Sequence, residues 1–180
     1  IPNLEHKAPS GNNYAGVDFG KLEDYSVISV IRREGETLKL IYLHEFPLGT
    51  PYIKVIGQLV KANKTFSLHK VLVDQTGVGE PILEEIKAQG LRNVEGLTFT
   101  IKIKEELLTT LKMAMEQKRL KIPYHRRLIQ QINEQQYNYS KSGHLQFSHP
   151  KGSHDDMLWA LALAVTAATR TEPSRLVRVM

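Results

Sequence analysis

Residues 14–46 read YAGVDFGKLEDYSVISVIRREGETLKLIYLHEF, and this stretch decides the fold. Three runs rich in Val, Ile, Leu and Tyr, at 14–19, 26–33 and 37–46, predict three strands. The second and third runs are joined only by Glu-Gly-Glu at 34–36, a short glycine-containing connection that predicts an antiparallel hairpin. The sheet is therefore expected to begin with antiparallel strands.

Helices and strands alternate along the rest of the chain. Helices are predicted, from apolar spacing and from Pro and Gly near their ends, over 52–62, 81–89, 104–118, 126–135 and 155–169. Further strands are predicted over 70–74, 94–101 and 120–122, with a second hairpin formed by 137–139 and 144–147. This order indicates an α/β fold, with a mixed sheet of five or more strands and helices on both faces. We expect a linker over 1–13, one domain over 14–170 and a tail over 171–180.

The apolar spacing also predicts which helix side chains enter the core. In the helix at 52–62, one face carries Ile53, Ile56, Leu59 and Val60. In the helix at 104–118, the core side chains are expected to be Leu107, Leu108, Leu111, Met113 and Met115. The last helix is apolar on most of its circumference, which indicates that it packs on several sides.

Length and composition exclude several classes of protein. The chain has 180 residues, with 24 Lys and Arg against 19 Asp and Glu, so its net charge is +5. That length suits a single domain, and a hydrophobic fraction of 41% is typical of a globular protein. The absence of cysteine excludes a disulfide scaffold, a thiolate zinc site and a thiol nucleophile. No apolar run reaches the ~18 residues of a membrane span. A pI near 9.3 is compatible with a polyanionic partner.

Aspartates stand at the edge of three apolar segments. Asp18 lies near the end of the first strand, Asp74 ends the strand at 70–74, and Asp155 and Asp156 open the last helix. If the two strands are parallel neighbours ~4.8 Å apart, their carboxylates lie close enough to share a cation. A helix N-terminus favours a carboxylate, and ligands of open sheets collect outside the carboxyl ends of strands. Oxygen ligands without cysteine point to Mg²⁺ or Mn²⁺ rather than zinc.

Each aspartate also has a simpler interpretation. Asp18 can be a turn residue, and Asp74 can start an Asx turn. Asp155 or Asp156 can merely cap the helix. The order of the three points along the chain nevertheless suits a single sheet edge, which favours a common metal site over three separate local roles.

Three motifs together resemble a known family. They read GVDFG at 16–20, VDQTGVGEP at 73–81 and SHDDMLWALALA at 153–164. In this order they are similar to the nuclease domain of the large terminase subunit, the DNA-packaging motor of tailed phages and related viruses. The resemblance covers residues 14–168, and the ordered set ending in His-Asp-Asp at 154–156 is its most specific part.

The resemblance implies a ribonuclease H-like fold and metal-dependent cutting of concatemeric double-stranded DNA, with little sequence specificity, at the start and end of packaging. It implies that Asp18 and Asp74 are the first two metal-binding acids, with Asp156 as the first choice for the third. Asp155 is the second choice, because Asp156 lies one turn before Ala160 and should face the sheet with it. Two-metal hydrolysis uses cations about 3.5–4 Å apart, here Mg²⁺ or Mn²⁺. Asp18 is then expected to bridge both ions, with Asp74 on one and Asp156 on the other.

The same resemblance implies partners and a location. The family normally carries an ATPase motor before the nuclease, but this chain has no Gly-x-x-x-x-Gly-Lys-Ser/Thr phosphate loop. The extended start fits a chain excised from a longer protein, or one made without its motor. Implied partners are double-stranded DNA, the ATPase domain, the portal protein and the small terminase subunit, with no membrane. The implied location is the host cytoplasm, at the viral procapsid during packaging.

Other residues are secondary candidates for the same chemistry. His154 could assist a proton transfer or orient a carboxylate, although a histidine at a helix start is more often a surface residue. The candidate DNA-binding residues are Lys104, Lys141, His144 and Lys151. The hairpin that carries the last three of these could equally be a solvated hairpin over buried aromatics. The loop at 76–79 is interpreted as a turn that needs a flexible backbone rather than as a phosphate loop.

Three other functions stay open on sequence alone. A Holliday-junction resolvase or transposase-type nuclease shares the fold and the carboxylates, and would prefer branched over linear DNA. An actin-like ATPase has similar Val-Asp-Phe-Gly and Val-Asp-Gln-Thr-Gly loops, but it needs two lobes and a longer chain. A non-catalytic module that docks on a portal or small terminase subunit would leave the acidic edge without a role.

Overall fold

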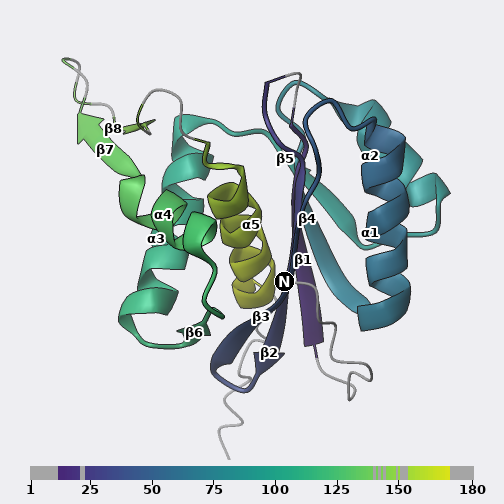
Figure 1. Cartoon of the computed structure of the whole chain (residues 1–180), viewed down its shortest axis with the longest axis horizontal. Helices are drawn as coiled ribbons and strands as arrows, with labels where there is room; N and C mark the ends of the chain where they lie inside the picture. Colours follow the sequence, from purple (N-terminus) through teal and green to yellow (C-terminus); the bar gives the residue numbers. More distant parts are fainter. Residues whose placement is uncertain are drawn as a thin grey trace, which may run out of the picture.

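The computed structural model describes residues 12–20, 23–139, 141, 143, 145–148, 150 and 154–170. Its main sheet has six strands in the order β5-β4-β1-β2-β3-β6 (Figure 1). The strands are β1 (Asn12–Asp18), β2 (Val27–Glu34), β3 (Thr37–Glu45), β4 (Leu68–Asp74), β5 (Val94–Leu97) and β6 (Leu120–Lys121). β1 pairs antiparallel with β2 and parallel with β4, and so lies inside the sheet.

The sheet is mixed, as the strand order along the sequence predicted. β2 and β3 form the expected antiparallel hairpin, while β5 and β6 join the two edges in parallel pairings. The turn between β2 and β3 is tight and holds Gly35 at a φ of 59°, a backbone conformation that glycine adopts without strain. The expectation of antiparallel first strands in a sheet of five or more is therefore confirmed.

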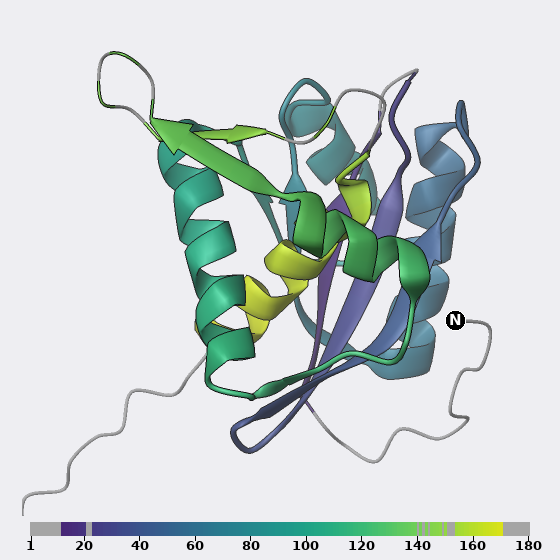
Figure 2. The ribbon, with the colours of Figure 1, turned by 60° about the vertical axis from the view of Figure 1, so that its left-hand side comes forward.

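Helices cover both faces of the sheet (Figure 1). One face carries α1 (Tyr52–Phe66) and α2 (Glu80–Ala88). The opposite face carries α3 (Ile101–Glu116), α4 (Arg126–Glu134) and α5 (Asp156–Arg170), with α5 closest to the strands (Figures 1 and 2). Each face has its own cluster of buried apolar side chains, so the domain is a three-layer sandwich.

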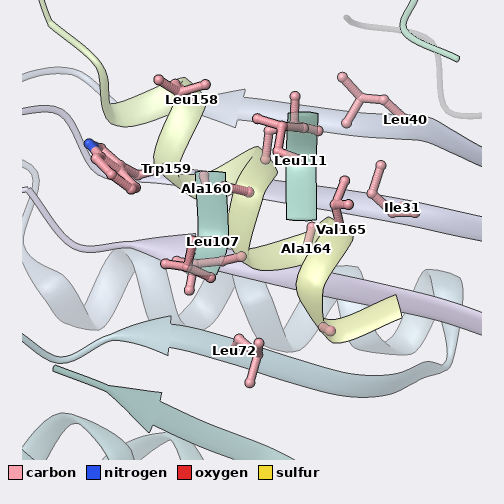
Figure 3. Packing of buried hydrophobic residues seen from close by; sticks show 14 of the residues in the cluster. Ile31, Leu40, Leu72, Leu107, Leu111, Leu158, Trp159, Ala160, Ala164 and Val165 are labelled. Carbon is pink, nitrogen blue, oxygen red and sulfur yellow. The ribbon is translucent and has the colours of Figure 1, made fainter. Parts of the chain in front are cut away.

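The packing of α5 on β1 determines where the start of α5, at Asp156, lies relative to the end of β1, at Asp18. Every residue of α5 from Asp156 to Ala168 is buried. The approach to β1 is close, because a Cβ at Gly16 would collide with the carbonyl oxygen of Ala160. Figure 3 shows Ala160 and Ala164 on α5 among the side chains of the strands and of α3. Small residues on both elements thus fix where the first turn of α5 lies relative to the end of β1.

Several element boundaries differ from the sequence predictions. The first strand begins at Asn12 rather than at 14, and α1 continues to Phe66 rather than ending at 62. The strand predicted over 94–101 ends at Leu97. Thr100 instead caps α3, with its side-chain oxygen accepting a hydrogen bond from the backbone N–H of Ile103, so the helix begins at Ile101. Because Thr100 satisfies a free N–H of the helix, α3 starts within the apolar run at 94–101 that had been predicted as a single strand.

Three side chains predicted for the core are exposed. Ile53 is 54% exposed on α1, and Met113 and Met115 are 50% and 39% exposed on α3. The buried face of α3 consists of Leu107, Leu111 and Ala114, and that of α1 consists of Val55, Ile56, Leu59, Ala62 and Phe66. Each helix therefore buries a face that differs from the predicted one: α3 packs against α5 through leucines and an alanine, and apolar spacing alone could not distinguish this face from the one that carries the methionines.

The second predicted hairpin is present as a separate two-stranded sheet. β7 (Gln136–Tyr139) pairs antiparallel with β8 (Leu145–Ser148). β7 follows the end of α4 after one residue, and the hairpin extends away from the main body (Figure 2). Within the described part of the chain, no helix has both the length and the apolar character needed to cross a membrane.

Candidate metal centre

The first two predicted acids are direct neighbours in the sheet. Asp18 is the last residue of β1 and Asp74 is the last residue of β4, and the two are partners in the parallel register. Adjacent strands lie ~4.8 Å apart, so the two residues stand side by side at one edge. Asp18 is only 7% exposed. The parallel pairing on which the sequence argument depended is therefore present.

Asp156 reaches the same edge from the first turn of α5. Its side chain is buried, and its Oδ2 accepts a hydrogen bond from the backbone N–H of Tyr25 at 3.3 Å. The Nδ1 atom of His154 lies 3.7 Å from the same Oδ2. The ring of Tyr25 packs edge-on against the His154 ring, with 4.9 Å between centroids. His154 is thus placed to orient the Asp156 carboxylate.

The carboxylates are electrostatically coupled. Burial raises the pKa of Asp18 well above its ordinary value, and the negative charges of Asp74, Asp156, Asp155 and Asp24 raise it further. Burial likewise raises the pKa of Asp156 from 3.8 to about 6, with Asp24 and Asp155 adding to the rise and the Tyr25 amide opposing it. Asp18 and Asp156 therefore each lie in the negative field of neighbouring carboxylates, which a bound cation would relieve.

The donor chemistry fits a hard divalent cation, although the side chains do not enclose one closely. Among the residues that the structure describes, no three acidic or histidine side chains converge tightly enough to form a complete ligand group. Among the described residues, the largest charge effects on the buried Asp18 nevertheless come from carboxylates. Carboxylate oxygens are the ligands that Mg²⁺ and Mn²⁺ prefer. We call Asp18, Asp74, Asp155 and Asp156 together the acidic cluster.

Asp74 also makes the local contact that the simpler interpretation expected. Its Oδ1 accepts a hydrogen bond from the backbone N–H of Thr76 at 2.8 Å, which is an Asx turn. The following loop holds Gly77 and Gly79 at positive φ, and the Thr76 hydroxyl accepts from the backbone N–H of Phe99 at 2.7 Å. The loop at 76–79 is thus a hydrogen-bonded turn with glycines at positive φ, in agreement with the interpretation from sequence. The Asx turn is compatible with a metal-binding role for Asp74, because the turn fixes the orientation of the same carboxylate that lies beside Asp18.

Two residues at this edge were missed by sequence reasoning. Asp24, in the connection between β1 and β2, raises the pKa of both Asp18 and Asp156. Tyr25 supplies the backbone donor to Asp156. In the sequence, Asp24 follows Asp18 by only six positions, which is a weak indication that the two lie near each other. An acid in a polar loop is normally solvated, so this spacing alone does not predict a place at the site.

The candidate DNA-binding residues are placed unequally. The Nζ atom of Lys104 lies 5.4 Å from the centroid of the Trp159 ring, which holds its charge beside the start of α5. Lys141 is an exposed residue between β7 and β8. His144 and Lys151 lie outside the described residues. The role of all four in binding DNA stays a prediction.

Comparisons with known proteins identify the family and the fold of this chain. A family model described as Terminase RNaseH-like domain matches residues 15–168. A large terminase subunit of Thermus virus P23-45 is 29% identical over 149 residues, which cover 83% of this chain and 30% of that protein. The crystal structure of the large terminase nuclease from thermophilic phage G20c is similar with a TM-score of 0.80 at 28% identity, covering 90% of this chain and 85% of that chain.

The nuclease of phage G20c has also been solved with metals. The structures with bound magnesium and with bound cobalt each give a TM-score of 0.80 at 28% identity, and the structure with bound zinc gives 0.70 at 27%. All three comparisons cover 90% of this chain and 84% of the other. The chain spans about 30% of the length of the curated relatives that it matches. Because the family model matches most of the chain and the structure superposes on a terminase nuclease with a TM-score of 0.80, the chain has a ribonuclease H-like fold and belongs to the terminase RNaseH-like domain family.

Proposed function

We propose that this domain is a Mg²⁺- or Mn²⁺-dependent endodeoxyribonuclease that cuts concatemeric double-stranded DNA during viral genome packaging. The observation that carries the proposal is the parallel register of Asp18 with Asp74, with the buried Asp156 at the same edge. Three acids from distant parts of the chain thus lie at the edge of the sheet where a ligand of an open sheet is expected. Relatives solved with magnesium, cobalt or zinc support a divalent-cation site in this fold.

In the proposed mechanism the acidic cluster would hold two divalent cations at the edge of the sheet. Asp18, central and buried, would be their shared ligand, Asp74 would serve one cation, and Asp156 with Asp155 would serve the other. When bound, such cations supply Lewis-acid polarisation of the scissile phosphodiester and activation of water for an in-line displacement. The chain's own contribution is orientation: the Tyr25 N–H fixes Asp156, with the His154 ring beside it, and the Asx turn fixes Asp74.

The substrate assignment rests on charge and on the relatives. Binding through phosphates gives little sequence specificity, because phosphate contacts carry no base information. Lys104, Lys141, His144 and Lys151 are the residues proposed to contact the backbone of the duplex. The chain matches large terminase subunits, so we propose the terminase ATPase domain, the portal protein and the small terminase subunit as partners, and the procapsid in the host cytoplasm as the site of action.

A plasmid assay tests the proposed function. Supercoiled plasmid is incubated with Mn²⁺ and the wild-type chain, Asp18→Asn or the control Glu116→Gln, which neutralises an exposed acid at the far end of α3. We expect nicking and linearisation by the wild type and by Glu116→Gln, and no cutting by Asp18→Asn. Equal cutting by Asp18→Asn would contradict the site. Adding a four-way junction to the assay separates the resolvase alternative, because a resolvase would cut the junction in preference to linear duplex.

A further inference from the structure

Helix α1 carries positive charge that no acid of its own balances. Over residues 46–66 the charged residues are Lys54, Lys61 and Lys64, and all three are exposed. None of them forms an ion pair with another residue that the structure describes, whereas lysines of β3, β4 and α3 are paired with glutamates. At 3.6 residues per turn, the three lysines lie within an arc of roughly 80°. One face of α1 is therefore a stripe of lysines without a partner in the described part of the chain.

A groove of about 510 Å³ lies beside this stripe. Phe46 and Pro47, just after β3, form one side of it, and Lys54, Gly57 and Lys61 of α1 form the other. We call these five residues the α1 groove. The described residues that line it include two lysines and no acid. The two lysines are seven positions apart, which places them ~10.5 Å apart along the helix axis.

Gly57 lies in this groove although the fold does not require a glycine there. Glycine inside a helix lowers its stability relative to alanine. A Cβ on Gly57 would meet no atom within 4 Å, in contrast to Gly16, where a Cβ would collide with α5. The φ of Gly57 is not positive, so its backbone conformation is open to any residue. A glycine that neither packing nor conformation explains leaves the helix surface open to the close approach of a ligand.

The α1 groove begins at the same edge of the sheet as the acidic cluster. Val27 is the register partner of Asp18 in β1 and of Glu45 in β3, so Glu45 stands two strands, or about 10 Å, from Asp18. The backbone N–H of Phe46 donates to the carbonyl of Ser26 at 2.9 Å, which fixes the start of the groove at this edge. From there α1 runs along the face of the sheet opposite to α5 (Figure 1).

The chemistry of this surface fits the phosphate backbone of duplex DNA better than it fits a protein partner. Lysine is depleted at protein–protein interfaces, whereas protein–DNA interfaces are strongly positive. Lysines neutralise phosphates without reading the bases, so a stripe of them binds a duplex with little regard to its sequence. An open helix surface between two lysines gives the sugar–phosphate chain room to lie close to α1.

We propose that the α1 groove, extended by Lys64, is a second DNA-binding surface, which holds one phosphate backbone of a duplex beside the acidic cluster. The choice of DNA as the polyanion rests on the proposed function. Lys104 belongs to α3, on the other face of the sheet. A duplex bound to both helices therefore crosses the edge at which Asp18 ends β1.

The test measures binding of a fluorescein-labelled 20-bp duplex to the whole chain by anisotropy, in EDTA and over a series of salt concentrations. Lys54→Met and Lys61→Met should each reduce the slope of log affinity against log salt by about 0.9, which is about 8-fold weaker binding near 0.1 M salt. Lys87→Met is the matched control, because Lys87 is exposed on α2, which covers the same face of the sheet and carries three glutamates. It should change neither quantity. An unchanged slope in Lys54→Met and Lys61→Met, or an equal loss in Lys87→Met, would overturn the proposal.

A substitution without charge tests the groove itself. Gly57→Met fills the space between the two lysines and replaces glycine by a better helix former. It should raise the melting temperature of the chain and weaken duplex binding, whereas a variant that damages the fold lowers both. A Gly57→Met chain that binds the duplex as the wild type does would remove the groove from the proposal.

Two comparisons separate the alternatives. Labelled poly-L-glutamate stands for an acidic protein segment, and tighter binding of it than of the duplex, lost in Lys54→Met, would overturn DNA as the partner. A chain that binds the duplex through Lys54 and Lys61 but cuts no plasmid with Mn²⁺ contradicts the proposed function and leaves the DNA-binding surface standing. A chain that cuts plasmid while Lys54→Met and Lys61→Met bind the duplex as the wild type does overturns the surface alone.

Discussion

Neutralising Asp156 should make the metal-free fold more stable at neutral pH. Burial raises the pKa of this carboxyl from 3.8 to about 6. At 1.36 kcal/mol per pKa unit, this rise corresponds to roughly 3 kcal/mol that the ionised side chain takes from the free energy of unfolding. The dipole of α5 favours the charge by about 0.3–1 kcal/mol, which reduces the net penalty to roughly 2 kcal/mol. Asp156→Asn removes the penalty and keeps an oxygen that can accept from the Tyr25 N–H.

The pH dependence of this effect has a definite sign. Well below a pH of 3.8 the carboxyl is protonated in both states, so ionisation contributes no difference between wild type and variant. Between 3.8 and about 6 the unfolded chain loses the proton while the folded chain keeps it, so the stability of the wild type falls as pH rises. Above about 6 the penalty is complete.

Urea denaturation in EDTA, repeated across this pH range, measures the difference. Asp156→Asn should gain roughly 2 kcal/mol over the wild type near pH 8 and almost nothing near pH 3. Adding Mn²⁺ should reverse the order, because only the wild type offers the full acidic cluster to the cation. A variant that is less stable than the wild type near pH 8 without metal, or a difference that does not change with pH, would refute the electrostatic reasoning.

Three further predictions concern other contacts. Gly16→Ala should lower the free energy of unfolding by about 1–3 kcal/mol, measured by urea denaturation, because the new methyl collides with the backbone of Ala160. Mn²⁺ should raise the melting temperature of the wild type but not of Asp18→Asn, measured by calorimetry. Lys104→Met should weaken duplex binding and reduce the slope of log affinity against log salt by about 0.9, measured by fluorescence anisotropy, whereas the exposed Lys112→Met should change neither.

The acidic cluster lowers the stability of the metal-free fold, and the same carboxylates are the proposed cation ligands. Asp18 is buried at the end of β1 with Asp74 beside it, and each charge raises the free energy of the folded state. The apolar packing of α5 on the sheet offsets this repulsion, because the helix is buried along almost its whole length (Figure 3). A site built in this way is expected to gain stability from the cation that it binds.

Much of the fold was predictable because the signals are local. Runs of β-branched and aromatic residues predicted the antiparallel β2 and β3, and the glycine between them predicted the turn. The predictions were wrong where the same apolar spacing is compatible with two different buried faces of a helix. Apolar spacing on α3 is satisfied equally by Leu107 with Met115 and by Leu107 with Ala114, and packing against α5 selected alanine.

By itself the sequence determined which segments become strands and helices and which of them end in aspartate, since both follow from residue types along a short stretch of chain. Only the tertiary structure decided that Asp18 and Asp74 are register partners and that Asp24 acts on both Asp18 and Asp156. These relations depend on strand order and on the close approach of α5 to Gly16, which arise from packing among segments far apart in the chain and leave no pattern in any one of them.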